Sequence, residues 1–313
     1  AHTAQRHKIM IAGEHGMLGQ ALARLISTAY PDYELIHTPK RSRLDFHDKT
    51  QTLAYMHENK PDHIFLTAAR VGGIGDNIDH PVDFLQDNLT IQNNVMSAAH
   101  EAGVHSLVFT ASTCIYPLAA PQPYREDSIL SGGLEESNKA YAIAKLSGIE
   151  LAKSYCTQYG RRYRSVLLTN LYGLEDSRDI HACHVIPALI LKTLKAKNSG
   201  DTNISIWGSG KPSRDFLHVD DAASALMLVL EKWNKIEPIN IASGQEITIK
   251  KLTEMIACIA GFDGELKFDL NKPDGVPSKS VDISKINNLG WKPKIALEDG
   301  LRQTLQHYER HAL

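Results

Sequence analysis

The fold is decided by the stretch HKIMIAGEHGMLG, which runs from His7 to Gly19. Its first half is an apolar run typical of a strand, and apolar residues recur at helical spacing from Leu18 to Ile26. This stretch contains three glycines, Gly13, Gly16 and Gly19, which could form a simple tight turn. Between a strand and a helix, however, this spacing favours a dinucleotide site, because bare backbone can approach a pyrophosphate and a helix N-terminus favours negative charge.

Further strand-like runs follow, with helical stretches between them. They lie at Glu34 to His37, His63 to Ala68, Ser106 to Thr110 and Ser165 to Thr169. This alternation predicts an α/β fold with a doubly wound parallel Rossmann sheet. From about Leu174 the pattern loosens, which predicts a smaller, discontinuous α/β C-terminal substrate lobe. We expect residues 1–173, together with 214–243, to form the NADP-binding domain, and residues 174–213 and 244–313 to form the substrate lobe.

Composition excludes several classes of protein. The 313 residues carry 34 Lys and Arg against 36 Asp and Glu, so no basic field is available for nucleic-acid binding. No apolar run has the length of a membrane span, and the N-terminus lacks the apolar core of a signal peptide. The four cysteines, at 114, 156, 183 and 258, form no Cys-x-x-Cys pair. We therefore expect a cytoplasmic protein with reduced thiols and no metal site.

The end of the second predicted strand carries cations. His37 is followed by Lys40, Arg41 and Arg43, and no acidic residue stands there to bind a free ribose 2′-hydroxyl. This pattern favours NADP over NAD. The alternative is a solvated basic loop, which is common on protein surfaces.

Tyr141 and Lys145 are four residues apart, which places them on one face of a helix. A nearby cation is expected to lower the pKa of a phenol and to suit it for proton exchange with a carbonyl oxygen. Such a pair also occurs by chance on many helices. Ser112 strengthens the functional interpretation, because it follows the fourth strand at the ligand-bearing end of the sheet.

The three glycines, Ser112 and the Tyr141-x-x-x-Lys145 pair resemble the extended short-chain dehydrogenase/reductase family. Eight segments are similar to its members that form GDP-fucose. They are Val71 to Ile74, Ser112 to Pro117, Tyr141 to Lys145, Asn170 to Gly173, His184 to Leu189, Trp207 to Gly210, Arg214 to Asp220 and Lys272 to Gly275.

The resemblance implies an NADPH-dependent homodimer that epimerises GDP-4-keto-6-deoxy-D-mannose at C3 and C5 and reduces it at C4 to GDP-L-fucose. It implies catalytic roles for Ser112, Cys114, Tyr141, Lys145 and His184, with Cys114 and His184 exchanging carbon-bound protons. The implied cofactor-binding residues are Gly13, Gly16, Met17, Gly19, Lys40, Arg41, Arg43, Ala68, Ala69, Lys145, Asn170, Leu171 and His184. The implied substrate-binding residues are Lys192, Trp207, Arg214 and Asp274.

Taken one by one, these residues have other interpretations. Cys114 could be a small buried hydrophobe and His184 a hydrogen-bonded loop residue. Trp207 could be a core aromatic instead of a stacking surface. Arg214 could pair with Asp215 or Asp220 instead of a diphosphate.

The chain departs from the family pattern at two places. Glu14-His15 stands where many members carry His-Arg, which removes a cation expected near the adenosine phosphate. Lys192 replaces the usual Arg and offers a point charge instead of a bidentate fork. Two rival functions remain: a sibling enzyme acting on a GDP-colitose precursor or a GDP-heptose, and a non-catalytic NADP-binding sensor.

Overall fold

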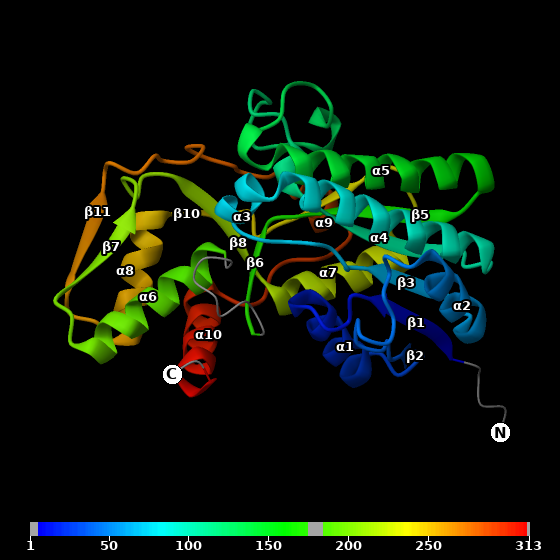
Figure 1. Cartoon of the computed structure of the whole chain (residues 1–313), viewed down its shortest axis with the longest axis horizontal. Coiled ribbons are helices and arrows are strands. Elements are labelled where there is room, and N and C mark those ends of the chain that lie inside the picture. Colours follow the sequence, from blue (N-terminus) through cyan, green and yellow to red (C-terminus); the bar gives the residue numbers. More distant parts are fainter. Residues whose placement is uncertain (1–5, 175–183, 312–313) are drawn as a thin grey trace.

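The computed structural model describes residues 6–174 and 184–311 (Figure 1). The main sheet of this part of the chain contains β1 (His7–Ala12), β2 (Tyr33–Ile36), β3 (His63–Leu66), β4 (Ser106–Ser112), β5 (Arg162–Leu168) and β9 (Ile239–Ile241). Their order is β2-β1-β3-β4-β5-β9, and every pair is parallel. The chain winds outward in both directions from β1 and β3, so the carboxyl ends of these two strands form the switch point where such sheets bind ligands.

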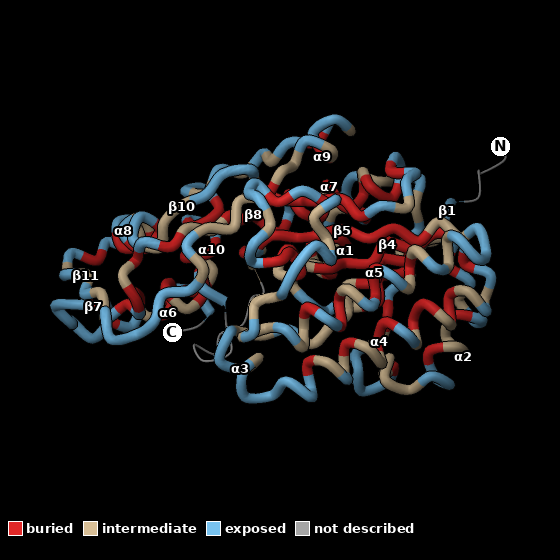
Figure 2. The backbone as a smooth tube through the Cα atoms, turned by 90° about the horizontal axis from the view of Figure 1, so that it is seen from above, coloured by how far each residue is buried: buried red, intermediate tan, exposed pale blue. Residues whose placement is uncertain are grey.

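Helices cover both faces of this sheet. On one face lie α1 (Met17–Ala29) and α7 (Val219–Lys232); on the other lie α2 (Lys49–Asn59), α4 (Pro81–Glu101) and α5 (Lys139–Tyr159). Ile9 and Ile11 pack with α1 and α7, whereas Met10 and Ala12 pack with α4 and α5. The strand is apolar without a break because both of its faces are buried. Figure 2 shows the central strands β4 and β5 as buried.

A second group of elements lies beside the sheet (Figure 1). It contains a three-stranded sheet of β10 (Glu246–Thr248), β8 (Ser213–His218) and β6 (Asn170–Tyr172), and a two-stranded sheet of β11 (Glu265–Asp269) and β7 (Asn203–Trp207). The helices α6 (Val185–Ser199), α8 (Ile249–Ala260) and α10 (Leu297–His311) share a separate apolar core with these strands.

Short helices connect the larger elements. They are η1 (Thr113–Ile115), η2 (Glu126–Ser128), η3 (Glu136–Asn138), α3 (Ile74–Asp79) and α9 (Ser284–Asn288). None of the helices within 6–174 and 184–311 is long and apolar enough to cross a lipid bilayer.

The predicted fold class is confirmed. The first strand has the expected bounds, and the Tyr141–Lys145 stretch is helical. β4 and β5 extend beyond the apolar runs that predicted them, to Ser112 and back to Arg162, because the two strands pair with each other along their whole length, including these polar ends. The division into two domains stays a prediction. Cys114, Cys156 and Cys258 are free thiols, and Cys183 lies outside the described residues.

Candidate active site

The glycine turn follows β1 and opens α1. Gly13 has φ +106°, and a Cβ there would lie 2.4 Å from the Ala68 amide nitrogen. A Cβ on Gly19 would lie 2.0 Å from the Gly13 carbonyl oxygen. Gly16, the N-cap of α1, meets nothing closer than that oxygen at 3.5 Å. The first and third glycines therefore permit close packing, and the middle one leaves bare backbone where an anion can approach the helix N-terminus.

The other predicted cofactor residues at this edge of the sheet are distributed around the turn. Met17 is the first residue of α1, and Ala68 and Ala69 follow β3, with the Ala68 amide donating to the Ala12 carbonyl at 2.7 Å. Lys40, Arg41 and Arg43 are exposed on the turn after β2, where the Arg43 amide donates to the Lys40 carbonyl. The turn, the strand end and the cations fit a dinucleotide that carries a 2′-phosphate.

Ser112, Cys114, Tyr141 and Lys145 are brought together at the carboxyl end of β4. The Cys114 amide donates to the Ser112 hydroxyl at 3.3 Å, at the start of η1. On α5, the Lys145 ammonium lies 5.7 Å from the centre of the Tyr141 ring. A thiolate at Cys114 would raise the pKa of both α5 residues, which places the sulfur beside them.

Lys145 is a buried cation with two partners besides Tyr141. Its Nζ donates to the Thr110 carbonyl at 2.9 Å and lies 4.9 Å from the centre of the Phe109 ring. Burial lowers the pKa of Lys145 to about 8, and a Cys114 thiolate would act in the opposite direction. Thr110 and Phe109 therefore position the Lys145 ammonium. The sequence does not predict this role, because no sequence pattern in a buried strand shows which carbonyl accepts a hydrogen bond from a lysine.

The expected lowering of the Tyr141 pKa is wrong for this state of the protein. Burial raises the pKa of Tyr141, and a negative charge at Cys114 would raise it further. The Lys145 ammonium is directed at Thr110 and does not offset the loss of water around the phenol. Burial likewise raises the pKa of the Cys114 thiol.

Two further charged residues face Cys114. Lys279 and Lys145 both act to lower the thiol pKa, whereas Glu135 acts to raise it. Lys279 Nζ lies 2.8 Å from a Glu135 oxygen, and each side chain is 20% exposed. This ion pair is not predicted by the sequence. Its members are 144 positions apart, and neither belongs to a local motif.

His184, Asn170 and Leu171 belong to the second group of elements, at the start of α6 and in β6. His184 is the exposed N-cap residue of α6 and forms no side-chain capping bond. Among residues 6–174 and 184–311, no hydrogen bond links its ring to Cys114. Asn170 begins β6 and donates to the Asp215 carbonyl at 3.1 Å, and Leu171 follows it.

Two of the predicted substrate-binding residues, Lys192 and Asp274, lie close to a third, Trp207, or to the loop that follows it. The Trp207 side chain is 67% exposed, which excludes the core-aromatic interpretation. The Lys192 and Lys272 ammonium groups lie 5.8 Å and 4.9 Å from the centre of its ring. Asp274 accepts hydrogen bonds from the Ser209 amide at 2.7 Å and hydroxyl at 2.5 Å, which fixes the loop that follows the tryptophan.

Arg214 does not form the ion pairs that were the alternative to phosphate binding. Its guanidinium donates to the carbonyl oxygens of Ser213 and Val276, both at 2.6 Å. Asp215 instead accepts from two backbone amides, and Asp220 pairs with Arg24 at 3.4 Å. Burial lowers the pKa of Arg214, and the carboxylates of Glu135 and Glu246 act in the opposite direction.

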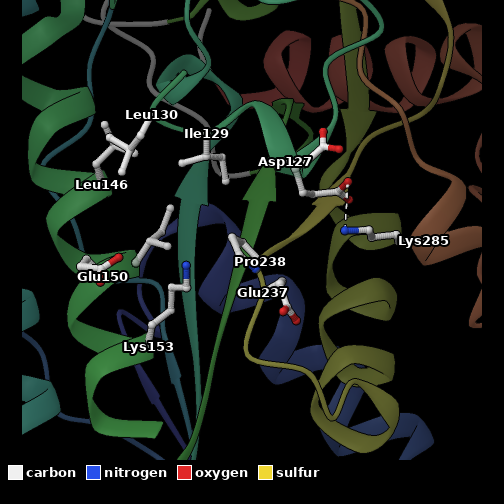
Figure 3. Close-up of a pocket in the computed structure, with 11 residues that line it drawn as sticks. Asp127, Ile129, Leu130, Leu146, Glu150, Lys153, Glu237, Pro238 and Lys285 are labelled. Carbon is white, nitrogen blue, oxygen red and sulfur yellow. Dashed lines mark ion pairs between the residues drawn. The ribbon is translucent and has the colours of Figure 1, made fainter. Parts of the chain in front are cut away.

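A separate surface pocket of about 270 Å³ contains none of the predicted site residues (Figure 3). Its lining includes Leu130, Leu146, Glu150 and Lys153, and Lys285 forms an ion pair with Glu126 at its edge. Within the described ranges, no cluster of three or more His, Cys, Asp or Glu side chains is arranged to hold a metal ion.

Comparison with known proteins decides the family. Residues 9–242 match the model of the NAD dependent epimerase/dehydratase family. The chain belongs to this family. It is similar to GDP-L-fucose synthase 1 of Arabidopsis thaliana, with 42% identity over 301 residues that cover 96% of this chain and 93% of the relative. The resemblance to the extended short-chain enzymes is thereby confirmed.

Two solved structures have the same fold. A GDP-L-fucose synthetase from Naegleria fowleri bound to NADP has a TM-score of 0.91 at 26% identity, covering 98% of this chain and 95% of its own. A GDP-mannoheptose C4 reductase from Campylobacter jejuni with NADP bound has a TM-score of 0.85 at 34% identity, covering 97% and 98%.

Proposed function

We propose that this chain is an NADPH-dependent epimerase-reductase that converts GDP-4-keto-6-deoxy-D-mannose to GDP-L-fucose. The observation that carries the proposal is the position of Cys114 beside Ser112, Tyr141 and Lys145. A reductase needs only the last three residues. A thiol beside them adds a group that can exchange a carbon-bound proton. The 42% identical relative named GDP-L-fucose synthase 1 supports the same function.

Epimerisation comes first, because the carbons on either side of the C4 ketone have acidic hydrogens. At each of C3 and C5 in turn, Cys114 removes the proton from one face and His184 returns a proton on the opposite face. Since burial raises the thiol pKa, the thiolate depends on nearby cations, and Lys279 and Lys145 are the two that lower that pKa. The position of His184 relative to Cys114 stays a prediction.

Reduction follows at C4. NADPH, when bound, supplies the hydride. The Ser112 hydroxyl donates to the keto oxygen, and Tyr141 gives that oxygen its proton as the alcohol forms. The Lys145 ammonium, 5.7 Å from the phenol ring, stabilises the phenolate that remains. The cofactor is held by the glycine turn and by Lys40, Arg41 and Arg43. The GDP-sugar is held by Lys192, Trp207, Arg214 and Asp274.

The test is to incubate the protein with NADPH and GDP-4-keto-6-deoxy-D-mannose and to identify the product by NMR. GDP-L-fucose is the expected product. The second candidate is a plain C4 reductase, which the 34% identical GDP-mannoheptose C4 reductase favours. A product that keeps the original C3 and C5 configuration would support the second candidate, and the absence of NADPH oxidation would refute both.

We also propose that the enzyme is a cytoplasmic homodimer with α4 and α5 at its interface. The two helices lie side by side on the outside of the sheet (Figure 1). Apolar side chains on this face remain exposed in the single chain, among them Val82 at 61% and Ile143 at 39%. Sedimentation at micromolar concentration tests the dimer, and a monomer there would refute it.

A further inference from the structure

A carboxylate inside the glycine turn reaches the tip of β2. The Glu14 side chain is only 9% exposed. Its Oε2 accepts from the Thr38 amide at 2.7 Å and lies 3.1 Å from the Thr38 hydroxyl. Its other oxygen, Oε1, lies 2.6 Å from Nδ1 of His37. The carboxylate therefore joins the pyrophosphate turn to the strand end that faces the adenosine ribose in this type of fold.

The hydrogen bond that His37 donates to Glu14 determines which ring nitrogen of His37 carries a proton. A carboxylate accepts only, so Nδ1 carries a proton whether the ring is neutral or charged. In the neutral ring, Nε2 then has a lone pair and no hydrogen to donate. In the charged ring, Nε2 becomes a donor. The His37 side chain is 74% exposed, so this second nitrogen is accessible to a ligand.

The position of His37 and the charges beside it indicate which ligand it binds. It is the first residue after β2, and the exposed cations Lys40 and Arg41 follow it on the same turn. The end of the second strand is where a Rossmann sheet binds the 2′-position of the adenosine ribose. We propose that Glu14 orients His37 as a pH-dependent specificity residue: the protonated ring binds the 2′-phosphate of NADPH, so the preference for NADPH over NADH rises as pH falls. This inference rests on the proposed cofactor.

Other titratable and charged groups surround the pair. From the glycine turn, His15 Nε2 lies 2.9 Å from the Thr38 carbonyl oxygen. From α2, the Tyr55 hydroxyl donates to the His37 carbonyl at 3.1 Å, and burial, with Glu14 and Glu58, raises its pKa. Tyr55 therefore keeps its proton across the range in which histidines titrate.

Lys40, Arg41 and Arg43 are exposed on the turn after β2, and an Asp45 oxygen lies 3.7 Å from Arg41 Nε. Within this surrounding set, His15 carries the other imidazole. His15 is therefore the matched control for His37.

The experiment measures dissociation constants for NADPH and NADH by fluorescence titration, without substrate, at about pH 6 and about pH 8.5. His37→Gln should weaken NADPH binding about tenfold at the lower pH and less than twofold at the higher one. NADH binding should not change at either pH. His15→Gln should follow the wild type. Because the 2′-phosphate itself titrates, the comparison is between variants at one pH.

Glu14→Gln separates this proposal from a purely structural role. The amide oxygen can still accept from Thr38, but the amide nitrogen now donates to His37 Nδ1. The neutral ring must then carry its proton on Nε2 and donate outward at any pH. Glu14→Gln should therefore tighten NADPH binding at about pH 8.5, whereas loss of a structural contact would weaken it.

Equal effects of His37→Gln at the two pH values, or an equal effect on NADH, would overturn the proposal. So would weaker NADPH binding by Glu14→Gln at the higher pH. Failure of the wild type to bind NADPH at either pH would instead refute the proposed function.

Discussion

Replacing Lys145 by methionine should stabilise the protein while abolishing reduction. Lys145 is 2% exposed, and burial lowers its pKa from 10.5 to about 8. At 1.36 kcal/mol per pKa unit, holding the charged form in the folded protein costs about 3 kcal/mol at neutral pH. Methionine has a similar length, fits the same apolar surroundings and carries no charge.

The substitution also removes favourable contacts. The ammonium donates to the Thr110 carbonyl at 2.9 Å and lies over the Phe109 and Tyr141 rings at 4.9 Å and 5.7 Å. Their loss costs about 1–2 kcal/mol. The net gain at neutral pH is therefore about 1–2 kcal/mol, which corresponds to a rise of roughly 3 °C in Tm.

The sign of the pH dependence is fixed by the lowered pKa. Between pH 8 and 10.5 the unfolded chain holds a proton that folded Lys145 has released. The wild type should therefore gain stability as pH rises through this window, and the advantage of Lys145→Met should disappear.

The assay is thermal unfolding followed by circular dichroism without cofactor, at several pH values from neutral to about pH 10. Lys153→Met, at a partly exposed position on the same helix, is the control and should show no such advantage. NADPH oxidation should fall at least about a hundredfold in Lys145→Met only. A Lys145→Met protein that is less stable than the wild type by the same amount at every pH would refute the reasoning.

Four further outcomes are expected. Gly19→Ala should lower Tm and NADPH affinity together, because its Cβ would lie 2.0 Å from the Gly13 carbonyl oxygen; an unchanged NADPH titration would contradict the close packing of the turn. Tyr141→Phe should bind NADPH normally but lose reduction at least about a hundredfold, since the hydroxyl acts only in the transition state; near-normal turnover would remove Tyr141 from the mechanism. Cys114→Ser should still oxidise NADPH but yield a GDP-6-deoxyhexose with the original C3 and C5 configuration, and deuterium uptake from solvent should fall in parallel. Fully inverted product with normal deuterium content would make Cys114 a structural thiol. Trp207→Ala should raise KM for the GDP-sugar about tenfold, because an exposed ring in stacking contact contributes about 1 kcal/mol or more; NADPH affinity, measured by fluorescence, should not change.

Much of the fold follows from local sequence. The strand from His7 to Ala12, the glycine spacing and the helix after it are short-range patterns, and each predicts structure without knowledge of distant residues. The positions of Ser112 at a strand end and of Tyr141 and Lys145 on one helix follow in the same way. Parallel strands bring their carboxyl ends to one edge, so the sequence also predicts that these residues converge.

The electrostatics of the site depend on tertiary structure. The Tyr141 pKa is raised, although its sequence neighbour Lys145 suggested the opposite, because burial outweighs a cation directed at Thr110. Lys279 and Glu135 reach Cys114 from segments that are far apart in the chain.

Tertiary structure also decides the role of Glu14. In the sequence it is a missing cation, whereas in the structure it is a buried carboxylate bonded to the tip of β2. Periodicity and spacing report which residues share an element. Only the packed chain determines how much water each charged group loses and which distant charges it meets, and these two quantities set its protonation.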